Sequence, residues 1–397
     1  MNQKARSSPA LVATLVGLAS LASAMGVGRF AFTPVLPLMQ ANGSVSVAQG
    51  AGLAAANYIG YFIGALACGL LAPAPHRVAR LGLVAVAAFT LAMGIDSDMT
   101  VWYALRFGAG MASACVLVGV SAWALTILAG SQRSGQAGWV FAGVGVGIAL
   151  AGLVGLIAGL RHVDPAHVWL ALGAASALVA VCAWMPLRPV AIAAFAPSDT
   201  PRELRSISWR LVLAYGTFGF GYIIPATFLP AMARAQIDDP AVFGWVWPVF
   251  GVAAAVSTAL TAFRFHRLAP RRLWMLAQGV LAAGVLAPVL SQHAAALLVS
   301  AVCVGGTFMV ITMAGMQEAR RVAGAAAPRL MALMTSAFAL GQIAGPFTVA
   351  LGSTASTGGM RLPSLIAVIV LLAGMWALRD VLPEAASPSV ITERNSA

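Results

Sequence analysis

Two arginines in this sequence lie inside long apolar stretches, and Arg29 is the more informative of them. It belongs to the segment 26–40, with two glycines just before it and two prolines after it. An arginine at the centre of a bilayer costs about 3 kcal/mol on insertion scales, so it normally faces a bundle interior or a watery cavity. A guanidinium can bind a carboxylate through two parallel hydrogen bonds. The sequence therefore predicts an anion site at Arg29, with a structural role towards backbone carbonyls as the alternative.

Acidic residues are absent from the long apolar runs that surround this arginine. Glu318 and Asp380, each at the end of a run, come nearest, and the five histidines lie at run ends or in loops. A carboxylate relay for protons, common in transporters, is therefore missing. Arg29 has no evident counter-ion in its own chain, and a buried unpaired charge is strongly unfavourable. We hypothesise that the counter-ion is the substrate, a small organic anion such as a carboxylate.

Two further residues could share that ligand. Thr33 follows Arg29 by one turn and is expected on the same helix face. Arg106 lies about one and a half turns inside its own apolar run. It could join the site, reach the outer headgroups, or pair with Asp96 or Asp98.

Uncharged polar residues in other apolar runs complete the candidate site. Asn57 and Tyr61 are one turn apart on one face, and Thr307 and Gln342 lie in later runs. Each could contact substrate, or could form a hydrogen bond between helices. The four cysteines show no paired spacing, so we expect no metal, disulfide or cofactor.

A second stretch repeats the surroundings of Arg29 at a constant offset of 193 residues (219 − 26). Gly219 and Gly221 match the two earlier glycines, and a Leu-Pro pair and a Met follow in both copies. Tyr222 takes the place of Arg29. Because the offset is close to half of 397 residues, we expect two tandem copies of one unit. If they face each other across a cavity, a cation lies on one wall and a phenol on the other.

Composition indicates which elements must hold these residues. Hydrophobic residues make up 60% of the chain and charged residues 9%, against about 25% charged in soluble domains. This excludes a soluble fold and argues against nucleic acid as the partner of the +12 net charge. The sequence predicts an all-α integral membrane protein in the lipid bilayer. Its twelve predicted spans are 11–40, 48–72, 78–95, 101–128, 137–160, 167–187, 209–235, 241–263, 273–291, 294–318, 329–352 and 363–382.

The basic residues predict an orientation. With both termini in the cytoplasm, 18 of the 23 Lys and Arg residues fall on the cytoplasmic side, and three fall in outer loops. This asymmetry follows the positive-inside rule. The acidic pairs Asp96/Asp98 and Asp238/Asp239 would then lie on the outer side of the membrane.

A Pro-rich polar segment at the midpoint divides the chain. We predict an N-terminal six-helix bundle over 1–187, a cytoplasmic linker over 188–208, a C-terminal six-helix bundle over 209–382 and a disordered cytoplasmic tail over 383–397. Parallel repeats of this kind are a transporter architecture with the site near mid-membrane.

Several motifs then carry a family resemblance across nearly the whole chain. The chain resembles a major facilitator superfamily (MFS) transporter of the YbfB/YjiJ-type branch. The resemblance implies two pseudo-symmetric six-helix bundles and alternating access in the cell inner membrane, and names no substrate. The matching motifs are Gly28–Pro34, Asn57–Tyr61, Arg106–Gly110, Phe141–Leu150, Gly305–Met309 and Phe338–Pro346.

One departure from the superfamily concerns the loop after the second span. Its usual signature carries an Asp between a Gly and basic residues, whereas here Gly69 leads to His76, Arg77 and Arg80 with no acid. We therefore do not expect the salt bridge that this Asp supports at the inner gate.

The sequence favours a monomeric transporter of a small, anionic molecule, as symporter, exchanger or uniporter. An efflux pump for amphipathic drugs or metabolites is an alternative within transport. A non-transporting receptor or a lipid scramblase is an alternative of another class. We expect no enzyme, because no nucleophile–base pair is evident.

Overall fold

The computed structural model describes residues 3–95, 98–190, 208–236, 244–264, 268–291, 293–353 and 361–379. Most of the predicted linker, the predicted tail, Asp96 and the Asp238/Asp239 pair lie outside the described residues. Within these ranges every regular element is helical. The elements are α1 (Gln3–Leu21), η1 (Ala22–Phe30), α2 (Phe32–Ala41), α3 (Val47–Leu71), α4 (Pro75–Ala92), α5 (Met99–Gly130), η2 (Ser134–Gln136), α6 (Ala137–Leu160), α7 (Pro165–Trp184), α9 (Trp209–Gln236), α11 (Val246–Phe263), α12 (Pro270–Leu290), α13 (Ala294–Ala323), η3 (Gly324–Ala326), α14 (Ala327–Ser353) and α15 (Arg361–Ala377).

The helices follow the predicted apolar runs closely. Each of the twelve runs overlaps a described helix, and the first run overlaps α1, η1 and α2 together. By length and composition, eight stretches of the described chain could cross a membrane, while α15 is a shorter apolar helix. The all-helical membrane class is confirmed. The count of twelve spans stays a prediction.

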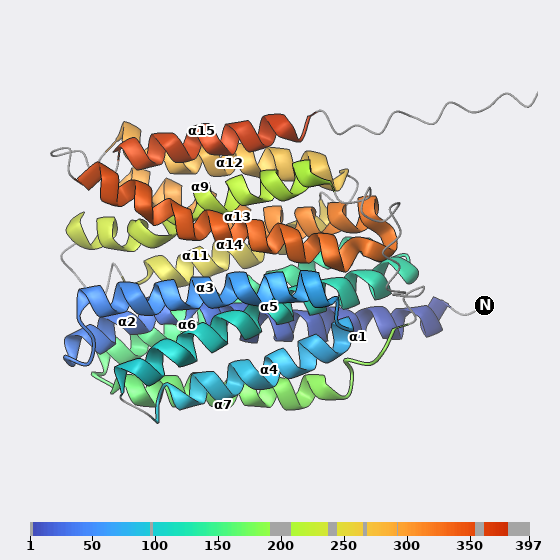
Figure 1. Cartoon of the computed structure of the whole chain (residues 1–397), viewed down its shortest axis with the longest axis horizontal. Coiled ribbons are helices and arrows are strands. Elements are labelled where there is room, and N and C mark those ends of the chain that lie inside the picture. The colour runs from blue at the N-terminus through green and yellow to red at the C-terminus, as the bar shows by residue number, and fades with distance from the viewer. Residues whose placement is uncertain are drawn as a thin grey trace, which may run out of the picture.

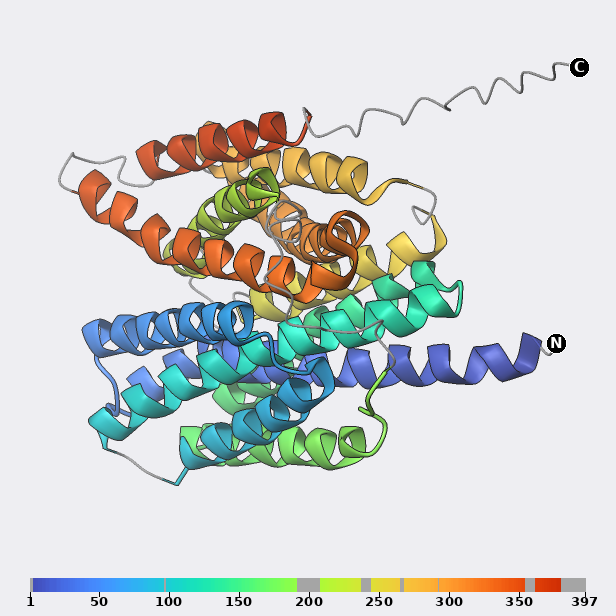
Figure 2. The ribbon, with the colours of Figure 1, turned by 45° about the vertical axis from the view of Figure 1, so that its right-hand side comes forward.

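The helices gather into two groups that lie side by side. Helices α1–α7 form one group and α9–α15 the other, as Figure 1 and the rotated view in Figure 2 both show. We call them the N-terminal and C-terminal groups. They meet where α6 packs along α11 and α3 packs along α14. The two groups therefore bring residues more than 300 positions apart in sequence into contact.

The first run is not one continuous α-helix. Its centre, η1, is a nine-residue π-helix that ends at Phe30. Pro34 lies four residues later and has no N–H to donate to the Phe30 carbonyl. The change of helix type therefore comes just before the two prolines of this run. π-helical turns occur often at functional sites, and this one contains Arg29.

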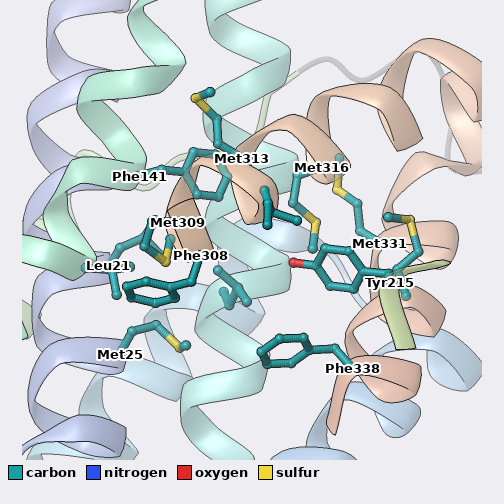
Figure 3. Close-up of a cluster of buried hydrophobic side chains, with 14 of the residues drawn as sticks. Leu21, Met25, Phe141, Tyr215, Phe308, Met309, Met313, Met316, Met331 and Phe338 are labelled. Atoms are coloured by element: carbon teal, nitrogen blue, oxygen red, sulfur yellow. The ribbon is translucent and has the colours of Figure 1, made fainter. Parts of the chain in front are cut away.

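Buried methionines and aromatic rings fill the space between the two groups. Figure 3 shows Met25 and Leu21 opposite Met309 and Phe308 of α13, with Tyr215 and Phe338 beyond them. These residues belong to one continuous buried cluster. Methionine side chains are flexible and polarizable, so they can repack against changing neighbours.

Candidate substrate site around Arg29

Arg29 is held in place by contacts at the end of η1. Arg106, on α5, donates from Nη1 to the Gly28 carbonyl and from Nη2 to the Arg29 carbonyl, both at 3.3 Å. Asn57, on α3, donates from Nδ2 to the Arg106 carbonyl at 2.9 Å and to the Gly28 carbonyl at 3.4 Å. Carbonyls at a helix end need partners when they are buried. Three elements thereby fix the backbone from which the Arg29 side chain projects.

The Arg29 guanidinium lies between the two helix groups. Only 3% of the residue is exposed. Nη2 donates a hydrogen bond to Oε1 of Gln342, on α14 of the C-terminal group. The guanidinium carbon lies 3.7 Å from the centre of the Tyr61 ring and 6.0 Å from that of Phe338. Cation–π contacts of this kind stabilise a desolvated cation by about 2 kcal/mol.

No described carboxylate pairs with this cation. The ion pairs within the described residues centre on Glu318, which binds Arg271 at 2.7 Å and Arg321 at 2.8 Å. This cluster joins α12 to α13 in the C-terminal group. Within the part of the chain that the structure describes, no ion pair involves Arg29.

Several buried polar atoms around Arg29 have no described hydrogen-bond partner. They are Arg29 Nε and Nη1, Gln342 Nε2, the Tyr222 hydroxyl and Asn57 Oδ1. A buried polar group without a partner costs about 1–3 kcal/mol. Such groups rarely cluster in a native protein unless something else satisfies them. The cluster contains more donors than acceptors, which suits an acceptor-rich ligand.

Stacked aromatic rings line the same region on the C-terminal side. The Tyr222 ring, on α9, stacks on Phe308 at 5.0 Å and 19°, and on Phe338 at 6.1 Å and 28°. Phe308 also stacks on Phe250 of α11 at 5.3 Å and meets Phe30 of η1 edge-on at 6.1 Å. Phe338 approaches both the Arg29 guanidinium and the Tyr222 ring, so it links the cation to the ring stack. The site is thus a single cation beside a wall of rings.

The structure brings three of the predicted residues into direct contact. Arg29 contacts Tyr61 within the N-terminal group and Gln342 in the C-terminal group. Tyr222 lies in the adjacent ring stack and shares Phe338 with Arg29. The sequence predicted that Arg29 and Tyr222 face each other across a cavity. In the structure they are linked indirectly, through the Phe338 ring that both approach.

Other predicted residues have supporting or separate positions. Asn57 bonds to neighbouring backbone, as its alternative interpretation proposed. Thr307 donates to the Cys303 carbonyl of its own helix at 2.6 Å. Thr33 is partly exposed and has no hydrogen bond among the described contacts. The π-helical geometry of η1 breaks the one-turn relation on which its place beside Arg29 depended.

Of the roles left open for Arg106, reaching the outer headgroups is not the one that the structure shows. It is 3% exposed and its guanidinium also lies 4.6 Å from the Phe32 ring centre, so it does not reach headgroups. Asp98 instead begins α5 by accepting hydrogen bonds from the amides of Thr100 and Val101. These two bonds, that from Val101 first, lower the pKa of the Asp98 carboxyl below its usual 3.8. The burial of Arg106 goes with the packing of α5 against α3 and η1, which its position within one apolar run does not reveal.

Residues that the sequence interpretation missed are aromatic. Tyr58 lies 5.5 Å from the Arg29 guanidinium, measured to its ring centre, and Phe308 and Phe338 supply the stacked wall. A usable signal existed, because Phe338 precedes Gln342 by one turn and Phe308 follows Thr307 directly. Aromatic residues are so common in membrane helices that this spacing alone did not distinguish them.

The Arg29 region is closed to the cavity at the end of the molecule where α1 begins. That cavity, of about 760 Å³, lies between the ends of α5 and α13 and the start of α14, and Arg188 and Arg320 line it. Arg29 does not line it. Arg29 is 3% exposed, so a ligand could reach it from this cavity only if the intervening side chains or helices moved.

Comparisons with known proteins agree with the resemblance. A family model described as "Uncharacterised MFS-type transporter YbfB" matches residues 21–379. Among solved structures, the human organic anion transporter MFSD10 (TETRAN) matches with a TM-score of 0.67 at 15% sequence identity, covering 95% of this chain and 100% of that chain. A search of curated proteins found no match. At 15% identity, the structural match concerns the fold alone.

Proposed function

The chain belongs to the family of the MFS-type transporter YbfB, and from this premise we propose that it carries a small organic anion bound at Arg29. Membership of this family supports a transporter of small molecules in a membrane. The substrate class rests on one observation: a buried guanidinium with two unpaired nitrogens and no described carboxylate partner.

The chemistry of the guanidinium favours a carboxylate. Arg29 has five N–H donors and no acceptor, while its described side-chain hydrogen bond uses one nitrogen. A carboxylate that displaced the Gln342 oxygen would meet Nη2 and an unpaired nitrogen beside it. Two parallel hydrogen bonds between oppositely charged groups would replace one bond from the guanidinium to a neutral amide. Hydrogen bonds that involve an ionised group are about twice as strong as those between two neutral groups.

The position of Gln342 suggests how binding and movement are coupled. The Arg29–Gln342 bond joins η1 of the N-terminal group to α14 of the C-terminal group. An anion that competes for Arg29 would break this bond and leave the two groups joined through the ligand. A ligand shifts a conformational equilibrium only through different affinities for the two states. We infer that exchange of Gln342 for substrate supplies this difference.

The fold likeness to an organic anion transporter is consistent with this proposal. Organic anion transport is a property of MFSD10, and the residues on which this proposal depends are this chain's own. We further propose two six-helix bundles, cytoplasmic termini, a monomer and the inner membrane, as the sequence predicts. An efflux role for amphipathic anions differs in direction only, and the aromatic wall would suit it.

The proposal predicts that anion binding depends on Arg29. Purified protein in detergent is tested by thermal shift against acetate, hexanoate, benzoate and succinate, and by exchange of the stabilising anion in proteoliposomes. We expect at least one anion to stabilise the natural protein, and Arg29→Gln to abolish both responses. Arg29→Lys should lose most of the exchange, because lysine keeps the charge without the planar fork.

Two variants control this experiment. Arg77→Gln removes an exposed arginine on α4 and should leave both responses intact. Gln342→Glu places a carboxylate beside Arg29, so it should stabilise the empty protein and prevent anion binding. Equal stabilisation and exchange in Arg29→Gln and in the natural protein would show that the proposal is wrong.

A further inference from the structure

The free charge at the site sets the charge of its ligand. Arg29 and Arg106 both lie here, but Nη1 and Nη2 of Arg106 donate to the carbonyls of Gly28 and Arg29. Arg29 keeps two nitrogens, Nε and Nη1, without described partners, whereas Arg106 keeps only Nε. A ligand with two negative charges could form a hydrogen-bonded ion pair through only one of them, because both Nη atoms of Arg106 already donate to carbonyls, and burying a second carboxylate without such a partner is costly. The donors still available on the two guanidinium groups therefore favour a ligand with one negative charge.

The polar atoms next to Arg29 favour a compact acceptor group. Gln342 Nε2 and the Tyr222 hydroxyl are buried donors without described partners. A carboxylate has two oxygens that together accept about four hydrogen bonds. The unpaired nitrogens of Arg29 and these two donors could fill that capacity. A carboxylate thus satisfies atoms that the empty protein leaves unpaired.

The rest of the ligand must fit among aromatic rings. Tyr222 lies between Phe308 and Phe338, with centre-to-centre distances of 5.0 Å and 6.1 Å, and the Tyr61 ring covers one face of Arg29. Rings prefer offset-stacked or edge-to-face contacts at 4.5–7 Å. A planar ring entering here would exchange ring–ring contacts of the protein for equivalent contacts with the ligand. A saturated skeleton would break these contacts and replace them only with dispersion.

Building on the proposed function, we infer that the anion bound at Arg29 is an aromatic monocarboxylate. Its carboxylate binds Arg29, Gln342 and Tyr222, and its ring packs against Phe308 and Phe338. This class excludes dicarboxylates and neutral aromatic amides of the same shape. It also ranks saturated ring acids below their aromatic counterparts, although both carry the same charge.

Matched ligands test this inference. Dissociation constants are measured by calorimetry for benzoate, cyclohexanecarboxylate, phthalate and benzamide, and for the longer pair 3-phenylpropionate and 3-cyclohexylpropionate. In at least one matched pair, we expect the aromatic acid to bind tenfold or more tightly than the saturated acid. Phthalate should bind at least tenfold more weakly than benzoate, and benzamide should show no binding.

Variants of the ring wall provide the second readout. Phe308→Leu and Phe338→Leu should bring the aromatic-to-saturated ratio towards one while the saturated acid still binds. Phe263→Leu is the matched control, because this ring is largely exposed on α11 and should not alter the ratio. The unchanged affinity for the saturated acid shows that the variants are folded.

The outcomes separate this inference from the proposed function. Equal affinities of aromatic and saturated acids, both dependent on Arg29, would overturn the aromatic class and leave an organic anion transporter. Tighter binding of phthalate than of benzoate would overturn only the inference that the ligand carries one negative charge. No binding of any carboxylate to the natural protein would overturn the proposed function, and this inference with it.

Discussion

The Arg29 and Tyr222 segments are two copies of one pattern that have acquired different structures. In both, the first glycine allows a neighbouring helix to approach closely. A Cβ on Gly26 would overlap the backbone of Gly147, and a Cβ on Gly219 would overlap the Phe338 carbonyl. The helix type differs, since η1 is π-helical whereas α9 is α-helical across Gly219 and Tyr222. The two copies therefore share close packing against a neighbouring helix, but they differ in local backbone conformation.

The side chains around the two segments explain this difference. At η1, Arg106 and Asn57 supply donors to the Gly28 and Arg29 carbonyls, so these carbonyls are satisfied outside the helix. The Tyr222 ring instead stacks between two phenylalanines and needs no such support. The repeat therefore preserves close helix contacts, while the polar chemistry is concentrated in one copy. The comparison can be tested by substitutions in both copies.

The largest effect is expected where the copies are most alike. Gly26→Ala and Gly219→Ala each force a methyl group into backbone atoms that cannot rotate away. Overpacking typically costs about 1–3 kcal/mol, and both variants should lose stability by amounts near the upper end. Thermal unfolding in detergent measures the loss. Gly279→Ala is the control, because its nearest neighbour would be Met375 Sδ at 3.7 Å. A loss in one copy alone would contradict the shared packing.

A smaller effect is expected where the copies differ. Arg106→Gln removes the donors to the Gly28 and Arg29 carbonyls. Leaving such groups buried without partners costs about 1–3 kcal/mol, and the Arg29 side chain should lose its fixed position. We expect a lower unfolding temperature together with weaker anion binding, measured by thermal shift and calorimetry.

Arg77→Gln, on the exposed face of α4, removes the same charge without touching η1 and should change neither quantity. If Arg106→Gln lowers stability but leaves anion affinity unchanged, Arg106 does not position Arg29. If it changes neither quantity, the support of η1 has been assigned to the wrong residue.

The sequence drew attention to Arg29 and Gln342, because a charged or amide side chain inside an apolar run is rare and needs a partner, and the structure places the two in contact. It also predicted the helices, since apolar runs near 20 residues long leave few alternatives. It could not predict η1, whose π-helical form depends on donors from α3 and α5. The same limit applied to Arg106, whose depth was judged from one helix considered alone.

The aromatic wall was harder to predict for a different reason. Phe308 and Phe338 are 30 residues apart and on different helices, so their contact with Tyr222 depends on the order in which helices pack. Hydrophobicity indicates that such residues are buried in protein or lipid, without indicating which of the two. Only the arrangement of α9, α13 and α14 distinguishes a ring at the site from a ring facing lipid.

The smallest effect concerns the phenol that replaces the cation in the second copy. The Tyr222 hydroxyl is buried without a described partner, so Tyr222→Phe removes an unfavourable group and keeps the ring stack. The empty protein should unfold at the same or a slightly higher temperature, although the loss of a buried hydroxyl is usually destabilising where it was hydrogen-bonded. Benzoate affinity should fall by up to tenfold, equivalent to about 1.4 kcal/mol, because one donor to the carboxylate is lost. If stability falls instead, the hydroxyl is already paired in the protein. If stability holds and benzoate affinity does not change, the second copy contributes rings to the site and no polar contact.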